Sequence, residues 1–182
     1  RRGQVMLHAL LATGAVHQHL VRAGLRCAVN LIVETGTARD AHHIACLVGY
    51  GATAVYPYLA YQTLHDLGVR GILKTKHGEM TQIGRSYRRG VKKGLLKIIS
   101  KMGISTIGSY RGSRLFEIVG LDREVVELCF AGTPSRIGGA GFAELQAEAE
   151  HLSAHGWDNN ALPEIGGLLQ FTPDGEYHQF NP

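Results

Sequence analysis

The sequence lacks most of the patterns that assign a chain to a function at first sight. Its three cysteines, Cys27, Cys46 and Cys129, lie far apart and show no CxxC or Cys/His spacing, so neither a zinc site nor a disulfide framework is expected, and reduced cytosolic thiols fit best. The dinucleotide-binding glycine fingerprint and the P-loop are absent. No apolar run reaches about 18 residues, which predicts no membrane span. The chain begins with Arg1 and not with Met, which indicates truncation or processing.

Hydrophobic residues and glycines are what the sequence does contain. Its 182 residues suffice for one domain or parts of two, and a 45% hydrophobic share predicts a packed core. The 24 glycines are dispersed among apolar segments and indicate many tight turns. The net charge of +4 is uneven, because residues 85–101 carry lysines and arginines but no acid. Such a segment suggests an anionic partner, although a solvated helix face is the commoner explanation.

The first part of the chain alternates between helical and strand patterns. Apolar spacing and turn residues predict, in order, a helix over Val5–Gly24 that Gly24 stops, a buried strand over Leu25–Glu34, a helix over Ala41–Val48 that Asp40 caps, a strand over Thr53–Tyr56, and a helix over Tyr58–Leu67 that Gly68 ends. Helices alternating with strands are typical of parallel βα units whose sheet is covered on both faces. We therefore expect an α/β fold.

The alternation breaks at residues 69–82, which make the best candidate for a domain boundary. Beyond it, the pattern predicts a helix over Ser86–Met102, a strand over Ile104–Ile107, a helix over Arg114–Val119, a short helix over Arg123–Phe130 that Asp122 caps, and a helix over Gly141–His155. The tail Asn159–Pro182 has Gly and Pro clusters and no clear period. No internal repeat of the solenoid kind is found.

Several polar groups could form a site, but each has a simpler structural explanation. The pairs His17/His19 and His42/His43 have the wrong spacing for a shared metal on a helix, which favours helix-end or surface histidines. Residues Glu34, Asp40 and His42 follow a predicted strand, where α/β sites form, yet capping and ion pairing are the commoner roles. The Gly138–Gly141 segment precedes a helix and could bind an anion or simply turn the chain.

The segment Lys97–Thr106, with Ser109–Gly112 after it, is more informative. It joins a basic helix to a predicted strand and then presents hydroxyls, an aromatic ring and the guanidinium of Arg111. This combination suits a phosphate or carboxylate ligand at the mouth of a barrel. Arg111 could instead pair with Glu117 or with a neighbouring domain. Spacing alone leaves the two interpretations even.

At these residues the chain resembles the large subunit of glutamate synthase. The similar blocks follow the family's order over nearly the whole chain: Leu11–His17, Asn30–Thr35, Gly49–Leu59, Lys93–Lys97, Ser100–Thr106, Ser109–Gly112, Thr133–Gly139, Gly175–His178 and Asn181–Pro182. Many blocks in one order are far more specific than any single glycine motif.

The resemblance implies an oxidoreductase that converts glutamine and 2-oxoglutarate into two glutamates. An N-terminal amidotransferase domain releases ammonia, which travels to a barrel that holds FMN. Electrons come from a small NAD(P)H-oxidising subunit or from ferredoxin, through an iron–sulfur cluster. The implied location is the cytoplasm, or the plastid where the parent is ferredoxin-dependent. The nucleophilic first-residue Cys and the cluster cysteines are missing here, so this piece alone is expected to be inactive.

By resemblance, residues 1–68 correspond to the end of the central domain, 69–83 to a connection, and 84–182 to the start of a TIM-type (β/α)8 FMN barrel that is incomplete. The residues we expect near FMN or the ammonia path are Lys101, Met102, Ser105, Thr106, Tyr110 and Arg111. Packing of the barrel against the central domain is the alternative role for them.

Two rival functions belong to other classes. One is a basic nucleic-acid-binding module built on the cations of residues 85–93, which would bind with a steep salt dependence. It is disfavoured because the helix lacks aromatic residues beyond Tyr87 and commits its apolar face to a core. The other rival is a non-catalytic scaffold domain. We expect neither nucleic acid nor a membrane among the partners.

Overall fold

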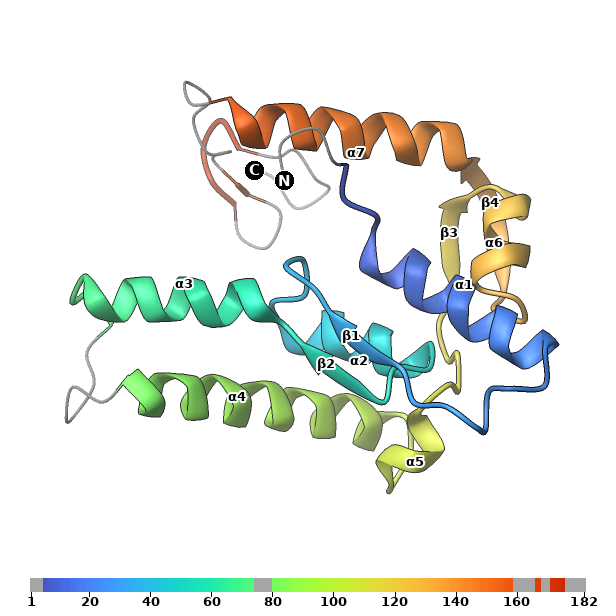
Figure 1. Cartoon of the computed structure of the whole chain (residues 1–182), viewed down its shortest axis with the longest axis horizontal. Helices are drawn as coiled ribbons and strands as arrows, with labels where there is room; N and C mark the ends of the chain where they lie inside the picture. Colours follow the sequence, from blue (N-terminus) through green and yellow to red (C-terminus); the bar gives the residue numbers. More distant parts are fainter. Residues whose placement is uncertain (1–4, 74–79, 159–165, 168–170, 176–182) are drawn as a thin grey trace. The chain divides into compact units, whose positions relative to one another are not determined.

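The fold was analysed in a computed structural model that describes residues 5–73, 80–158, 166–167 and 171–175. The chain divides into two compact units, one of residues 7–146 and one of residues 1–6 with 147–182. The elements in chain order are α1 Ala9–Arg22, β1 Ile32–Glu34, α2 Ala41–Gly49, β2 Ala54–Tyr56, α3 Tyr58–Val69, α4 Met80–Lys101, α5 Ile107–Tyr110, β3 Ile118–Leu121, α6 Arg123–Cys129, β4 Ser135–Ala140 and α7 Phe142–Trp157 (Figure 1). Helices are thus mixed with two small parallel sheets, which agrees with the expected α/β class.

The first βαβ unit consists of β1, α2 and β2. The strands pair in parallel with Val33 opposite Val55, and both valines pack against the core that surrounds α2. Asp40 caps α2, because its Oδ1 accepts a hydrogen bond from the backbone N–H of His43 at 2.9 Å. The opposite face of this sheet carries Ile32 and Tyr56, which are 73% and 51% exposed. Among the described elements of the 7–146 unit, α2 therefore covers one face of the sheet and the other face stays exposed.

The second βαβ unit consists of β3, α6 and β4 and is built in the same way. Its strands are parallel, and Asp122 caps α6 by accepting a hydrogen bond from the N–H of Glu124. Ile118 faces the core, whereas Val119 and Ile137 are 68% and 59% exposed. Helix α1 packs against α6 inside the 7–146 unit. This sheet also has an apolar face that no described element covers within that unit.

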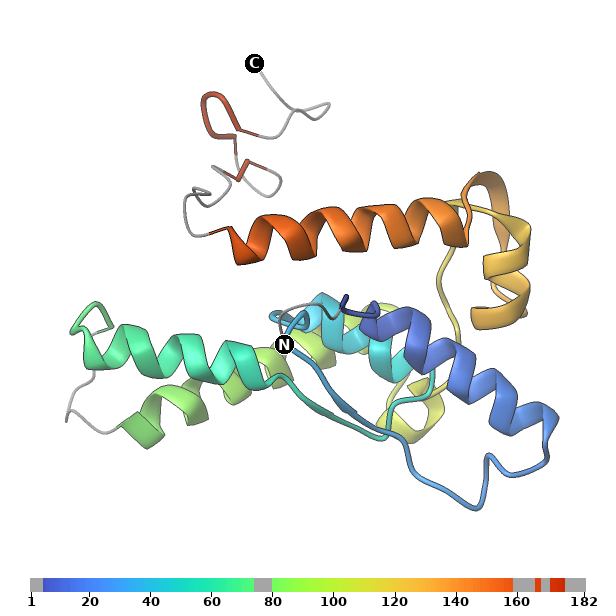
Figure 2. The ribbon, with the colours of Figure 1, turned by 45° about the horizontal axis from the view of Figure 1, so that its top comes forward.

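Helices α3 and α4 complete the unit on the side of the first sheet. They lie side by side in both ribbon views, and α4 also packs against α2 (Figures 1 and 2). The close approach of α4 to α2 occurs at Gly94, whose missing side chain leaves room for the methyl group of Ala41. Farther along α4, Ile99 is buried in the core around α2. Helix α4 is therefore amphipathic, with one face in the core and a basic face outside.

Tyr50 joins the two cores. Its ring stacks on Phe116 at 5.5 Å between centroids and meets the edge of Phe130 at 4.9 Å. Its hydroxyl shares a 3.0 Å hydrogen bond with the hydroxyl of Thr133, which is itself buried. Since Tyr50 directly follows α2 while Phe116 and Phe130 flank β3 and α6, this aromatic cluster fixes the two βαβ units to each other.

Most of the predicted helices are confirmed, with altered ends. The N-caps at Asp40 and Asp122 are found as predicted, and α7 matches the helix expected over 141–155. Gly24 lies just beyond α1 with a φ of 70°, in the left-handed region that favours glycine after a helix. Gly68 does not end α3, which continues to Val69.

Two predicted strands are wrong. Only the last three residues of the stretch Leu25–Glu34 form β1, because the preceding residues turn back on the helix: the N–H groups of Leu25 and Arg26 both donate to the carbonyl of Leu20. The stretch Ile104–Ile107 is not a strand either. Residues 104–106 are irregular and Ile107 begins the single helical turn α5, and no described strand pairs with this stretch.

Two further predictions in the second half are wrong for a related reason. The helix expected over Arg114–Val119 is replaced by an irregular stretch and β3, because Arg114 has a φ of 54° and Ile118–Leu121 pairs with β4. The Gly138–Gly141 segment is neither an anion site nor a flexible turn. Its first three residues belong to β4, and the N–H of Gly141 donates to the carboxylate of Glu144 in α7. The tail expected to lack a period lies mostly outside the described residues.

No helix in the described ranges is both long enough and apolar enough to cross a bilayer.

Candidate functional site

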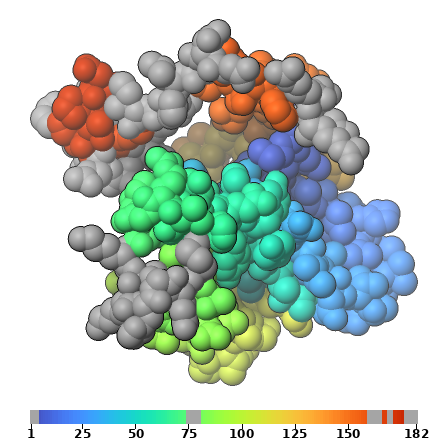
Figure 3. All heavy atoms as spheres, turned by 60° about the vertical axis from the view of Figure 1, so that its left-hand side comes forward, coloured from blue at the N-terminus to red at the C-terminus, as the bar shows by residue number. Residues whose placement is uncertain are grey.

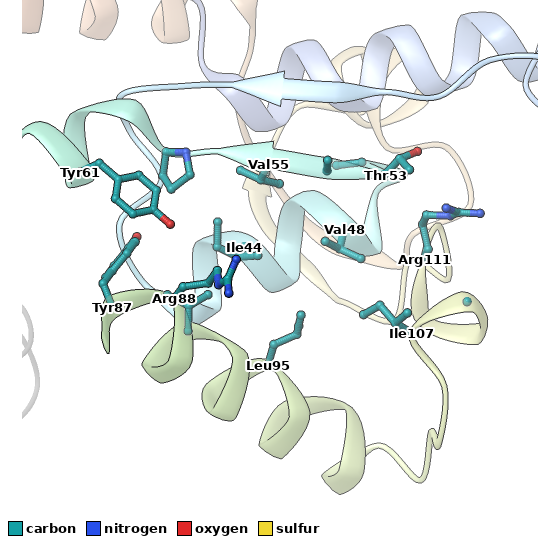
Figure 4. Close-up of a pocket in the computed structure, with 15 residues that line it drawn as sticks. Ile44, Val48, Thr53, Val55, Tyr61, Tyr87, Arg88, Leu95, Ile107 and Arg111 are labelled. Atoms are coloured by element: carbon teal, nitrogen blue, oxygen red, sulfur yellow. The ribbon is translucent and has the colours of Figure 1, made fainter. Parts of the chain in front are cut away.

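A cavity of the 7–146 unit lies between α2, α4 and β2, and we call it the α2–α4 pocket. It has a volume of about 370 Å³ and can be followed in Figure 4. Its lining residues are Ile44, Val48, Ala52, Thr53, Ala54, Val55, Pro57, Tyr61, Tyr87, Arg88, Val91, Leu95, Ile107, Gly108 and Arg111. Helices α3 and α4, which carry one wall of the pocket, face the viewer in the space-filling view (Figure 3). Apolar walls with a few polar groups are typical of small-molecule sites.

Tyrosines occupy one end of the pocket. The rings of Tyr61 and Tyr87 meet edge to face at 5.3 Å, and Tyr61 also stacks on Tyr56 at 6.2 Å. The hydroxyl of Tyr87 donates to the carbonyl of Arg39 at 2.8 Å. Burial is the main cause that raises the pKa of Tyr87, so it remains a neutral hydroxyl. In the part of the chain that the structure describes, the hydroxyl of Tyr61 makes no hydrogen bond.

Two arginines supply the charge of the pocket. Figure 4 shows the guanidinium of Arg88 beside Ile44, at the end that holds the tyrosines, and Arg111 at the other end near Ile107. Among the described residues, neither guanidinium takes part in a hydrogen bond or an ion pair. The pairing of Arg111 with Glu117 that spacing allowed is not found, because Glu117 lies 3.4 Å from Arg136 across the second sheet.

The six residues expected near FMN or an ammonia path lie in different environments. Lys101, Ser105 and Thr106 are exposed around the end of α4, and Met102 is 39% exposed. The hydroxyl of Thr106 shares a 2.9 Å hydrogen bond with that of Ser109, in the first turn of α5. These residues stand close together along the chain but do not line the α2–α4 pocket, which only Arg111 of the six reaches.

Tyr110, the remaining member of that set, is fully buried in the core around α2. Its hydroxyl donates to the backbone carbonyl of Ala45 in α2 at 2.9 Å. Burial, with smaller contributions from Cys46 and Tyr50, raises the pKa of Tyr110 to about 12. This side chain therefore ties α5 to α2 and places Arg111 at the pocket.

The histidines and cysteines that the structure describes do not gather into a metal centre. In residues 5–73 and 80–158, with the short described stretches beyond, no three His, Cys, Asp or Glu side chains are grouped suitably for a metal ion. Asp40 caps α2 through the N–H of His43, as the capping interpretation expected, and the Nδ1 of His43 also accepts a hydrogen bond from the N–H of Arg39 at 3.2 Å. Burial raises the pKa of the Cys46 thiol to about 11, which keeps it protonated beside His42.

His17 has a structural role that the sequence did not indicate. Its Nδ1 accepts a 3.0 Å hydrogen bond from Nε of Arg26, whose other nitrogens donate to the carbonyls of Val29 and Gly51. Burial, together with the charges of Arg26 and Arg114, lowers the pKa of His17 below its ordinary value of 6.5. The imidazole is thus held neutral as an acceptor.

This environment makes stability depend on pH. The pKa of His17 is lower in the folded chain than in the unfolded chain, so the unfolded chain binds more protons at mildly acidic pH. The stability that this histidine contributes is therefore fully present above about pH 6.5. It is lost as the pH falls through the folded-state pKa. His17→Gln keeps a hydrogen-bond acceptor that cannot be protonated. We therefore expect the free energy of unfolding of this variant to fall less steeply between pH 7 and pH 5 than that of the wild type. The measurement is urea unfolding followed by circular dichroism at several pH values. The control is His19→Gln, at an exposed position two residues away, for which the free energy of unfolding should depend on pH as in the wild type. If His17→Gln also shows the wild-type pH dependence, the assignment to His17 is contradicted.

Sequence reasoning missed the pocket because its polar groups come from separate elements. Arg88 was grouped with the basic face of residues 85–101, and Tyr87 was read as an isolated aromatic. A usable signal is present in the sequence: Tyr87 and Arg88 stand one helical turn before the core position Val91 and two turns before Leu95, so both border the buried face of α4.

Comparison with known families identifies the chain. A family model described as the glutamate synthase central domain matches residues 1–122. The chain belongs to the glutamate synthase family. The matched region includes α4 and α5, and with them the whole lining of the α2–α4 pocket.

Individual relatives agree with this assignment. The chain is 44% identical to a ferredoxin-dependent glutamate synthase of Cyanidium caldarium, over 100% of this chain and 12% of that protein. It is 44% identical to the large chain of an NADPH glutamate synthase of Bacillus subtilis, over 95% of this chain and 11% of the relative. It is 41% identical to an NADH glutamate synthase of Saccharomyces cerevisiae, over 96% of this chain and 8% of the relative. The chain therefore spans about a tenth of the length of these curated relatives.

Proposed function

We propose that this chain is part of a glutamate synthase large subunit, an oxidoreductase that transfers the amide nitrogen of glutamine to 2-oxoglutarate and yields two glutamates. The observation that carries the proposal is the match of residues 1–122 to the central domain, joined by 44% identity over the full chain to a relative named as this enzyme. The chain by itself is proposed to be inactive, because it spans 12% of that relative.

The domain assignment remains a prediction: residues 1–68 end the central domain, 69–83 connect, and 84–182 begin the FMN barrel. Two findings bear on where the boundary is drawn. The central-domain match continues to residue 122, and α4 packs against α2 and α3. Both favour a boundary later than the predicted connection.

The second βαβ unit, which lies within residues 84–182, supports the proposal of barrel-type architecture. In a (β/α)8 barrel the helices cover the outside of the strands, and the inner strand faces carry branched apolar side chains. The β3–β4 sheet packs one face on the core that contains α6 and exposes branched apolar side chains such as Val119 and Ile137 on the other. Further strands of the parent polypeptide would close such faces into a core.

FMN is the cofactor that the family implies, and part of the predicted set fits it. Lys101, Ser105 and Thr106 offer a cation and two hydroxyls at the surface, which suits a phosphate or ring oxygens, and Met102 offers an apolar contact. When bound, FMN supplies the hydride of the reaction. Tyr110 does not fit as a ligand, because its hydroxyl is bonded to Ala45 in the core. We assign it instead to the positioning of Arg111.

The described residues do not fit an iron–sulfur cluster. Cluster ligands are thiolates, whereas burial raises the pKa of Cys46 and of Cys129 and keeps both protonated. The third thiol, Cys27, is free and exposed. We therefore propose that the cluster is held elsewhere in the parent polypeptide. The proposed partners are its amidotransferase domain and remaining barrel, with either a small NAD(P)H-oxidising subunit or ferredoxin, in the cytoplasm or, for a ferredoxin-dependent parent, the plastid.

The test uses the full polypeptide that contains this chain. Purified protein is expected to carry FMN by its visible absorption and to form glutamate only when glutamine, 2-oxoglutarate and an electron donor are all present. Supplying reduced ferredoxin, NADH and NADPH in turn identifies the donor. The proposal is contradicted if the purified protein contains no flavin, or if glutamate forms without glutamine or without 2-oxoglutarate.

The predicted site residues are tested in the same protein. Lys101→Gln should lower the FMN content per polypeptide, because it removes a cation from the proposed flavin side. Lys97→Gln is the matched control, since it removes the same charge from an exposed position one turn earlier on α4. If both variants keep full flavin content, Lys101 has only a surface role.

A further inference from the structure

The α2–α4 pocket has an interior that resembles a ligand site more than a packing defect. Val48, Val55 and Leu95 line it from α2, β2 and α4 (Figure 4), and a volume of about 370 Å³ is within the usual range for small-molecule sites. A space of this size can hold a compact organic molecule.

The polar groups at one end of the pocket are suited to bind an anion. The guanidinium of Arg88 lies there beside Ile44, and no carboxylate among the described residues pairs with it. Arg88 is an exposed residue on the lining of the pocket, so its guanidinium is accessible to an entering ligand and can pair with a carboxylate through two parallel N–H groups. The hydroxyl of Tyr61, which makes no hydrogen bond among the described residues, points toward the same end. Arginine and a phenol are together well suited to bind a carboxylate.

We propose that the α2–α4 pocket binds a small organic monocarboxylate, with its carboxylate between Arg88 and Tyr61 and its apolar body against Val48, Val55 and Leu95. A single anionic group is inferred because Arg88 and Tyr61 share one end of the pocket, while the walls that follow are apolar. Arg111 stands at the far end of the pocket, where it is exposed and lies away from Arg88 and Tyr61. The site is separate from the exposed residues Lys101–Thr106 proposed to meet the flavin.

The other occupant that this geometry allows is a segment of the parent polypeptide. An acidic side chain from such a segment could pair with Arg88 and fill the pocket. The experiment therefore uses the full polypeptide, in which that segment is present and would block a small molecule.

The probe is 4-fluorophenylacetate, followed by fluorine NMR line broadening during titration of the full polypeptide. Its neutral amide, 4-fluorophenylacetamide, has the same ring without the charge. We expect the carboxylate to bind at least about tenfold more tightly than the amide, because a charged hydrogen bond to arginine is lost with the amide. Equal binding of the two, or no binding of either, overturns the proposal.

The residue assignment is tested with a matched pair on α4. Arg88→Gln should weaken binding of the carboxylate by about tenfold and leave the amide unaffected. Arg89→Gln removes the same charge from the adjacent exposed position, which does not line the pocket, and should leave both unaffected. An equal loss in both variants would mean that the carboxylate senses only the basic surface of α4, and the site would be rejected. Unchanged thermal unfolding of both variants excludes misfolding as the cause.

Discussion

Tyr110→Ala is expected to lower the free energy of unfolding of this chain by about 3–5 kcal/mol, the range for removing a buried aromatic side chain. Tyr110 is fully buried and packs with the core around α2. Its removal leaves a cavity beside α2 and leaves the α5 turn without its main contact. The measurement is urea denaturation followed by circular dichroism and fluorescence.

Tyr110→Phe is the control that separates packing from hydrogen bonding. It keeps the ring and loses only the bond to the carbonyl of Ala45, so a loss of about 1 kcal/mol is expected. In the full polypeptide, the same variant should retain FMN, because the hydroxyl faces the core and not a ligand. Loss of flavin in Tyr110→Phe with normal stability would instead place this hydroxyl at the cofactor.

Gly14→Ala is expected to cost about 3 kcal/mol, an effect of overpacking between two helices. Gly14 is buried in α1 at the contact with α6, and a Cβ there would overlap the carbonyl oxygen of Cys129 and approach the ring of Phe130. The obstacle is backbone, which cannot rotate away as a side chain can. Helix α1 would have to move away from α6. This movement would also break the hydrogen bond that the side-chain amide of Gln18 donates to the carbonyl of Ala131.

The matched substitution is Gly90→Ala in α4. Gly90 is also a glycine inside a helix, but nothing lies within 4 Å of the position its Cβ would take. Alanine lowers the conformational entropy of the unfolded chain, so Gly90→Ala should raise stability by about 0.5–1 kcal/mol. Opposite signs at the two positions would support close helix packing at Gly14. A neutral Gly14→Ala would show that α1 does not dock on α6 as described.

Local signals in the sequence were enough for several elements. Asp40 and Asp122 could be read as caps because a capping carboxylate bonds to N–H groups two or three residues away, and that contact does not depend on the rest of the chain. The helical spacing in α4 and the turn at Gly24 were likewise readable, since each involves neighbours along the chain. The resemblance to glutamate synthase also came from the sequence, because ordered blocks of residues need no coordinates.

Strand assignments failed where pairing decided the outcome. Ile104–Ile107 and β3 both contain isoleucine and branched residues that favour strands, yet of the two only β3 has a partner among the described residues, in β4. The glycines at 138 and 139 suggested a turn, but the backbone carbonyl of Gly120 passes so close to Gly139 that no side chain would fit there. A strand exists only where another strand lies beside it, and propensity within a short window cannot supply that information.

The sequence by itself determined most of the helices, the caps of α2 and α6, the βαβ order of the first unit and the family. The tertiary structure alone decided that Arg88 and Tyr61 would share one end of a pocket, that Tyr110 would face the core and not a ligand, and that Gly14 would touch α6. The physical reason is the range of the interactions. Caps and helical periods act within a few residues, whereas packing and site geometry join side chains tens of residues apart, whose positions follow from how whole helices and sheets fit together.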